Sequence, residues 1–241
     1  MPTKKKTTNP SVRSAKEKAK QSLSVNTIVA RGVGTLLVLG ILFVLSRPGV
    51  LDWVLERSPM RSVNTHGGIT NGEADLAEIF TPQVMYWRDE IERWAKERSL
   101  NPNLIATIIQ IESCGDPYVS SNAGAQGLFQ VMPFHFANGE NQLNPEINAL
   151  RGLNHLKDCL NWTNYDVGVS FACYNGGPSV IGQPQSQWYE ESRYYFRWGT
   201  GIYNDATNGA EESSTLREWL AAGGNILCGR ASETQTLLRP Q

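Results

Sequence analysis

One carboxylate in this chain stands where acid catalysis is chemically reasonable. Glu112 follows the apolar residues Ile108, Ile109 and Ile111 at the end of a predicted helix. Apolar surroundings disfavour the charged form of a carboxyl group and raise its pKa. A carboxyl group that keeps its proton near neutral pH can act as a general acid. Glu112 is therefore the candidate catalytic residue, although most glutamates near helix ends are solvated surface charges.

Polar side chains further along the chain could complete a binding cleft around such an acid. Residues 127–133 read GLFQVMP, and in an extended strand Gln130 and Met132 would point to the same side. An amide and a flexible apolar side chain on one face suit a polar ligand with apolar patches, such as an N-acetyl sugar. Tyr174 and Asn175 end another predicted helix, where a phenol and an amide can face the same cleft.

Helices are expected to position most of these residues. Apolar periodicity predicts five of them, over 83–98, 101–113, 148–160, 165–174 and 214–222. Asn101 followed by Pro102 is typical of a helix start, and the run Asn-Gly-Gly-Pro after Tyr174 is typical of a helix end. Only 127–132 reads as strand-like. The predicted fold class is therefore mainly α with a small β-hairpin.

Charge is distributed unevenly along the chain. The whole sequence has 22 Lys and Arg against 23 Asp and Glu, a net charge of −1. Residues 1–31 hold eight of the basic side chains and one of the acids, so the remainder has 14 basic and 22 acidic residues, a net charge of −8. A main body that repels phosphate argues against nucleic acid as a partner.

An apolar segment follows the basic leader. Gly32–Leu45 carries no charge, and the stretch 24–46 is long enough to cross about 30 Å of hydrocarbon. Basic residues before it keep the N-terminus cytoplasmic, so we expect a single-pass anchor with all later residues extracytoplasmic. The alternatives are a cleaved signal peptide, which the long leader and the lack of a small-x-small site disfavour, and a buried helix.

The four cysteines all follow the apolar segment, at Cys114, Cys159, Cys173 and Cys228. An even number in an exported domain predicts two disulfides, with three connectivities open, and buried free thiols are the alternative. The three histidines, His66, His135 and His155, show no ligand spacing, and no Cys/His cluster is present in the sequence. We therefore expect no metal and no cofactor.

Four motifs, IESCGDP, GAQGLFQVMP, NPEINALRGLNHL and FACYNGG, resemble the catalytic domain of soluble lytic transglycosylases in order and approximate spacing. This family is part of the goose-lysozyme-like superfamily, and the resemblance covers about residues 84–200. It implies a lysozyme-like (α+β) helical domain that acts on peptidoglycan glycan strands.

The resemblance also implies roles for individual residues. Glu112 matches the catalytic acid and base. Substrate-binding roles are implied for Ser113, Gln130, Met132, Tyr174, Asn175 and, with Glu191 in a looser match, Tyr195. Asn148 and Gly152 match positions that build the fold. Three departures stand out: Phe129 replaces a common methionine, His155 replaces a tyrosine, and two cysteines flank the active-site motifs. The family geometry would pair Cys114 with Cys173 and Cys159 with Cys228.

The resemblance further implies a mechanism with one carboxyl group. Four other acids read as loop or surface charges, at Asp116, Glu146, Asp158 and Asp166, and Asp116 is expected in the loop beyond the helix that Glu112 ends. Glu112 would protonate the oxygen between N-acetylmuramic acid and N-acetylglucosamine and then take a proton from the C6 hydroxyl, which closes a 1,6-anhydro ring. A hydrolytic lysozyme-type muramidase and a non-catalytic glycan-binding module are the alternatives, and a secretion, conjugation or phage role stays open.

The expected organisation has five parts: a basic cytoplasmic tail at 1–23, a transmembrane signal-anchor at 24–46, a linker at 47–82, the catalytic domain at 83–203, and a C-terminal extension at 204–241 that packs on the domain. Seven aromatic rings between Trp188 and Tyr203 either pack as a layer on the helical core or form part of a sugar subsite.

Overall fold

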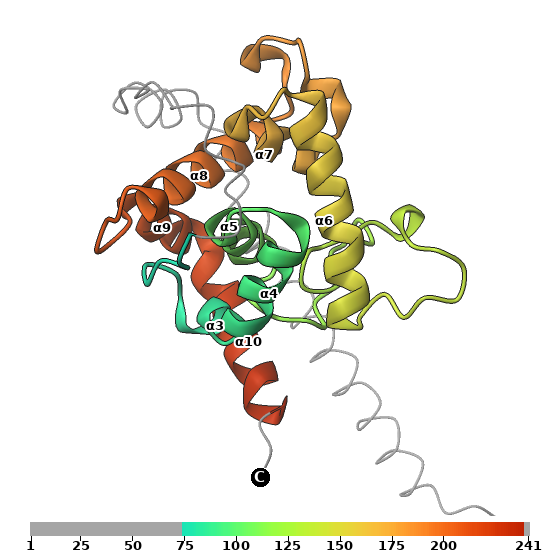
Figure 1. The fold of residues 1–241 in the computed structure, drawn as a ribbon, viewed down its shortest axis with the longest axis vertical. Coiled ribbons are helices and arrows are strands. Elements are labelled where there is room, and N and C mark those ends of the chain that lie inside the picture. Colours follow the sequence, from blue (N-terminus) through green and yellow to red (C-terminus); the bar gives the residue numbers. More distant parts are fainter. Residues whose placement is uncertain (1–73, 239–241) are drawn as a thin grey trace, which may run out of the picture. The chain divides into compact units, whose positions relative to one another are not determined.

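The computed structural model describes residues 74–238, and this part of the chain is mainly helical (Figure 1). Its α-helices are α3 (Pro82–Met85), α4 (Arg88–Arg98), α5 (Pro102–Glu112), α6 (Pro145–Trp162), α7 (Val167–Gly176), α8 (Glu190–Thr207), α9 (Ser214–Trp219) and α10 (Asn225–Leu238). A π-helical turn, Leu220–Gly224, joins α9 to α10. The mainly α prediction is confirmed for these residues.

The predicted tail and anchor, 1–23 and 24–46, lie outside the described residues, as does most of the predicted linker. Within 74–238, no helix is both long enough and apolar enough to cross a bilayer. The last part of the predicted linker belongs to the folded domain, since Leu76, Ile79 and Phe80 are buried in its core.

Local capping explains where several helices begin. The Asn101 side chain accepts a hydrogen bond from the main chain at the start of α5, as predicted. Asn144 caps α6 in the same way, so this helix begins three residues before the predicted 148. Asp166 caps α7. The predicted helix 83–98 is divided into α3 and α4 by a turn at Tyr86.

The predicted β-hairpin is wrong, because residues 74–238 contain only two isolated β-bridges, Ser120–Gln126 and Gln126–Val131. Gly127 and Gln130 adopt positive φ values of 71° and 46°, which turn the chain back on itself. The bridge between Gln126 and Val131 closes this turn. A tight turn has therefore replaced the extended strand that the apolar pattern of 127–132 indicated.

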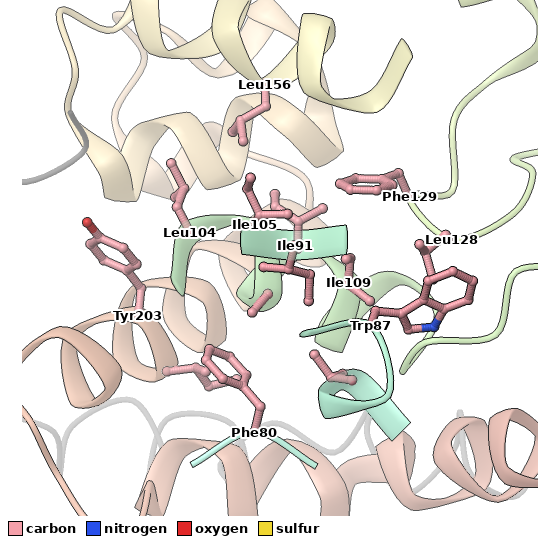
Figure 2. Packing of buried hydrophobic residues seen from close by; sticks show 14 of the residues in the cluster. Phe80, Trp87, Ile91, Leu104, Ile105, Ile109, Leu128, Phe129, Leu156 and Tyr203 are labelled. Carbon is pink, nitrogen blue, oxygen red and sulfur yellow. The ribbon is translucent and has the colours of Figure 1, made fainter. Parts of the chain in front are cut away.

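The core is built around α5, which packs against α3, α4 and α8. Figure 2 shows side chains from distant parts of the chain pointing toward one another around this helix. They include Phe80, Trp87, Ile91, Leu104, Ile105, Ile109, Leu128, Phe129, Leu156 and Tyr203, all of them buried. A helix that is apolar on nearly every face is buried in this way. Glu112 is the last residue of that buried helix.

Asn148 and Gly152 on α6 hold the turn 127–130 in place. The buried Asn148 Oδ1 accepts a hydrogen bond from the Phe129 N–H at 2.7 Å, and its Nδ2 donates to the Gln126 carbonyl at 2.8 Å. Gly152 allows close packing, because a Cβ there would lie 2.6 Å from the Phe129 Cβ. Both residues therefore build the fold, as the family resemblance implied.

Two disulfides are present, but not with the expected pairing. Cys114 is bonded to Cys228, and Cys159 is bonded to Cys173. The Cys159–Cys173 bond joins α6 to α7, which are consecutive helices packed side by side, and its Cα atoms are 5.7 Å apart. The pairing taken from the family geometry did not allow for this contact between neighbouring helices, nor for the helix that carries Cys228.

That helix, α10, was not predicted, and it fastens the C-terminal part to the start of the domain. It packs against α3. The Gln235 Nε2 donates hydrogen bonds to the Gln83 carbonyl at 2.8 Å and to the Gly115 carbonyl at 3.0 Å. Gly115 also accepts from the Trp87 indole N–H at 2.8 Å. The loop that follows Glu112 is therefore held from two sides.

Candidate active site

Glu112 lies at the C-terminal end of α5, and protein surrounds its carboxyl group closely enough that burial raises its pKa to about 8. The residue as a whole is partly exposed to solvent. A carboxyl group with this pKa carries its proton at neutral pH. The elevated pKa agrees with the expectation from its apolar sequence neighbours.

Tyr195 on α8 is the polar group that faces Glu112. Its hydroxyl lies near enough to lower the pKa of the Glu112 carboxyl, which opposes the larger effect of burial. The Tyr195 hydroxyl oxygen is buried and makes no ordinary hydrogen bond within 74–238. Burial and the charge of Glu112 both raise the pKa of Tyr195. Tyr195 is therefore a donor held beside the carboxyl group.

Tyr174 on α7 is a second tyrosine close to the acid. Its ring lies 6.3 Å from that of Tyr195, with the planes 28° apart. Burial raises the pKa of Tyr174, and the charge of Glu112 raises it further. The structure thus brings Glu112, Tyr174 and Tyr195 together, although they are up to 83 residues apart in the sequence.

Ser113 is completely buried and bonded to the main chain. Its hydroxyl donates to the Leu128 carbonyl at 2.7 Å and accepts from the Gly115 N–H at 3.0 Å. Ser113 therefore ties the end of α5 to the turn 127–130. Its hydroxyl is used in these main-chain bonds, so Ser113 supports the shape of the site.

Gln130, Met132 and Asn175 lie nearer the surface than Ser113. The Gln130 Nε2 donates to the Val119 carbonyl at 3.0 Å and to the Gly127 carbonyl at 2.9 Å. The amide nitrogen of Gln130 therefore stabilises the turn. Because these residues do not form a strand, strand geometry does not align Gln130 with Met132. Asn175 is exposed at the end of α7, with its Oδ1 accepting from the Ser192 hydroxyl at 2.9 Å.

Histidine contributes to the surroundings of Tyr174, which the spacing of the histidines did not indicate. The His155 ring lies 5.0 Å from the Tyr174 ring and 4.6 Å from the His135 ring. The exposed Phe134 ring lies 4.5 Å from that of His135. A line of rings thus runs from the surface to the tyrosine pair. The one sequence signal was the departure from tyrosine at position 155.

A second carboxylate near the acid is not found among residues 74–238. Burial and Tyr195 account for the shift in the pKa of Glu112, with no contribution from another acid. Asp166 caps α7, Glu146 accepts a hydrogen bond from Trp94, and Asp116 binds the main chain of its own loop. No group of three His, Cys, Asp or Glu side chains suits a metal ion in this part of the chain.

The aromatic stretch 188–203 mainly builds the core. Trp188, Tyr195 and Tyr203 are buried, whereas Tyr189 is 76% exposed. Tyr194 and Trp198 stack on each other along α8, with ring centroids 5.0 Å apart. Tyr195 is the member of this stretch that reaches the acid.

Known proteins are similar to the middle part of this chain. Residues 89–196 match the transglycosylase SLT domain. The chain is 29% identical over 114 residues to a transglycosylase of Enterobacteria phage PRD1, covering 46% of this chain and 41% of that protein. It is 30% identical over 89 residues to membrane-bound lytic murein transglycosylase E of Buchnera aphidicola subsp. Acyrthosiphon pisum (strain APS), covering 36% and 38%.

Among solved structures, an inactive mutant of the lytic transglycosylase Slt from Pseudomonas aeruginosa is similar at 23% identity and a TM-score of 0.44, covering 52% of this chain and 25% of that one. The chain spans about two fifths of the length of the curated relatives it matches. The matched segment contains Glu112, both tyrosines and the turn 127–130. Residues 89–196 are therefore similar to the transglycosylase SLT domain, both in the family model and in two named relatives.

Proposed function

We propose that this protein is a peptidoglycan lytic transglycosylase in which Glu112 serves first as the acid and then as the base. The observation that carries the proposal is the carboxyl group of Glu112, which keeps its proton up to about pH 8 and lies inside the matched segment. The name of the Buchnera relative supports murein as the substrate class.

In the proposed reaction, the Glu112 proton moves to the glycosidic oxygen between N-acetylmuramic acid and N-acetylglucosamine, and the bond from that oxygen to C1 breaks. The N-acetyl group of the muramic acid stabilises the positive charge at C1. The Glu112 carboxylate then takes the proton of the C6 hydroxyl, whose oxygen bonds to C1. The product is a 1,6-anhydromuramic end, no water is consumed, and Glu112 regains its proton.

The surrounding residues have supporting roles in this proposal. The Tyr195 hydroxyl can donate to Glu112 when it is a carboxylate, which stabilises the intermediate stage. Gln130, Met132 and Asn175 contact the sugar, and Ser113 acts from beneath by holding the turn. The absence of a second acid around Glu112 within 74–238 fits a reaction that needs no separate base.

We also propose that residues 24–46 anchor the protein in the membrane, with 1–23 in the cytoplasm and the proposed catalytic domain, 83–203, outside. The basic leader and the apolar run support this topology. Two disulfides suit an oxidising compartment, and the Buchnera relative is described as membrane-bound.

Digestion of purified sacculi with the detergent-solubilised full chain tests the proposal. Mass spectrometry of the released muropeptides should show anhydro ends for the wild type and for Glu97→Gln, which alters an exposed carboxylate, and no release for Glu112→Gln. Reducing ends would identify a hydrolytic muramidase instead. Binding without release would identify a glycan-binding module. Release by Glu112→Gln would remove Glu112 from the catalytic role.

A further inference from the structure

We infer that His155 is a positioning residue of the proposed active site, which holds Tyr174 toward Glu112 while the imidazole ring is uncharged. The inference rests on the proposed function, and it concerns a side chain that stands where the resemblance has tyrosine. In this role, His155 does not contact the substrate. His155 would act on the reaction through Tyr174 alone.

The first support is that His155 contacts Tyr174 in two ways. Its Nε2 lies 3.2 Å from the Tyr174 main-chain carbonyl oxygen. Because a carbonyl oxygen can only accept, the imidazole Nε2 carries the proton and donates. The two rings also pack with centroids 5.0 Å apart. His155 therefore constrains both the main chain and the ring of Tyr174 from the neighbouring helix.

The second support is that Tyr174 passes this constraint on toward the acid. Its ring packs against Tyr195, whose hydroxyl faces Glu112. The Tyr174 hydroxyl donates a hydrogen bond to the Phe129 carbonyl at 2.8 Å, within the turn 127–130. A shift of Tyr174 would therefore move the side chain beside the carboxyl group and the turn together. Misplacement of such groups by about 1 Å costs about a hundredfold in rate.

The third support is that the His155 environment disfavours a charged ring. His135, in the turn 133–135, packs against it at 4.6 Å, so two charged rings would repel each other. Burial and His135 lower the pKa of His155, whereas the Tyr174 carbonyl and Asp158 raise it by less. One turn earlier on α6, Arg151 is paired with Glu140. His155 is thus neutral at neutral pH and gains its charge in more acidic solution.

A charge on both rings would separate His135 from His155 and draw them toward water, which would release the Tyr174 ring. The reaction should then lose rate on the acid side for a reason unrelated to Glu112, which stays protonated there. The rate would be limited by His155 at low pH and by Glu112 at high pH.

Rates on soluble glycan strands, measured with the full chain between about pH 5 and pH 9, test the inference. His155→Ala should lower kcat about tenfold or more with little change in KM, because a positioning group is lost. His155→Phe keeps the ring packing but loses the hydrogen bond to the Tyr174 carbonyl, so its kcat at neutral pH should fall by less than that of His155→Ala, while the acid-side decline disappears. His135→Phe removes the repelling charge, so the acid-side decline should become weaker even though the pKa of His155 rises.

An acid-side decline that persists unchanged in His155→Phe would overturn the inference, as would an unchanged kcat in His155→Ala. NMR provides a readout that does not need glycan cleavage. The Tyr174 ring signals should shift with the titration of the His155 imidazole, and the titration midpoint should rise in His135→Phe. Coupled signals without any cleavage would contradict the proposed function but retain the positioning role, whereas uncoupled signals would reject the role itself.

Discussion

The hydroxyl of Tyr174 donates a hydrogen bond to the main-chain carbonyl of Phe129, 2.8 Å away, across 45 residues of sequence. The Phe129 N–H is bonded in turn to Asn148, so both polar groups of its main chain are used by side chains from other helices. The turn beneath the site is therefore held by α6 and α7 together rather than by strand pairing.

Replacing this tyrosine should have a measurable structural cost. Tyr174→Phe keeps the ring but leaves the buried Phe129 carbonyl without its donor, so we expect a loss of about 1–3 kcal/mol in the free energy of unfolding. Chemical denaturation monitored by circular dichroism measures this loss. Tyr189→Phe is the matched control, because Tyr189 is 76% exposed. Equal stability of the two variants would show that the bond does not hold the turn.

The activity should decline in alkaline solution. The general acid must carry its proton, and the pKa of Glu112 is raised to about 8 by burial. We therefore expect kcat/KM to fall tenfold per pH unit above about pH 8, with a midpoint there. Initial rates on soluble glycan strands at constant ionic strength provide the profile. A decline with a midpoint near the usual pKa of glutamate would exclude a protonated Glu112 as the group responsible.

Glu112 should also destabilise the folded protein as the pH rises. Its pKa in the folded protein is about 8, against an ordinary value of 4.5. Between these values the unfolded chain binds fewer protons than the folded one, so the free energy of unfolding falls by up to about 1.4 kcal/mol per pH unit. The stability that Glu112 contributes to the folded protein is fully present below its ordinary pKa and is lost as the pH rises through about 8.

The variant Glu112→Gln has no proton to lose at this site. Its thermal midpoint should therefore exceed that of the wild type by an amount that grows from about pH 5 to about pH 8. Scanning calorimetry at several pH values measures the difference. The exposed substitution Glu97→Gln should show no such trend, and a constant offset for Glu112→Gln would indicate an ordinary pKa.

The two disulfides should differ in their contributions to stability. The Cys114–Cys228 bond closes a span of 114 residues, and the Cys159–Cys173 bond closes a span of 14. On the chain-entropy account, removal of the longer link should cost about 2 kcal/mol more. Urea unfolding of the paired serine variants compares them. Unreduced peptide maps should contain both linked pairs, and a Cys114–Cys173 peptide would contradict the observed connectivity.

Features set by neighbouring residues were the ones that the sequence could predict. Short stretches of sequence determine the Asn101 cap, the apolar character of α5 and the end of α7. The elevated pKa of Glu112 was expected from the apolar residues just before it. The turn 127–130 was mistaken for a strand because its backbone is set by Asn148 and Gly152 on α6, which no local pattern reveals.

The remaining features depend on contacts between distant segments. The partner of Cys114 could not be chosen without α10, and His155 acquires its place only when α6, α7 and the turn 133–135 come together. Position 155 shows the limit of spacing arguments: a histidine without ligand spacing read as structural, yet its ring packs directly on Tyr174.

The Cys114–Cys228 link makes the polypeptide between these residues a closed ring. A peptide bond cut by a protease within the ring, for example in the exposed residues 137–139, would leave the two fragments joined through sulfur. The Cys159–Cys173 ring is nested inside it, so a cut between those residues would leave two cross-links intact. On a denaturing gel, a nicked molecule therefore migrates as one band without reductant and as two bands with reductant. Because the two fragments stay linked, each remains at a high local concentration for refolding with the other.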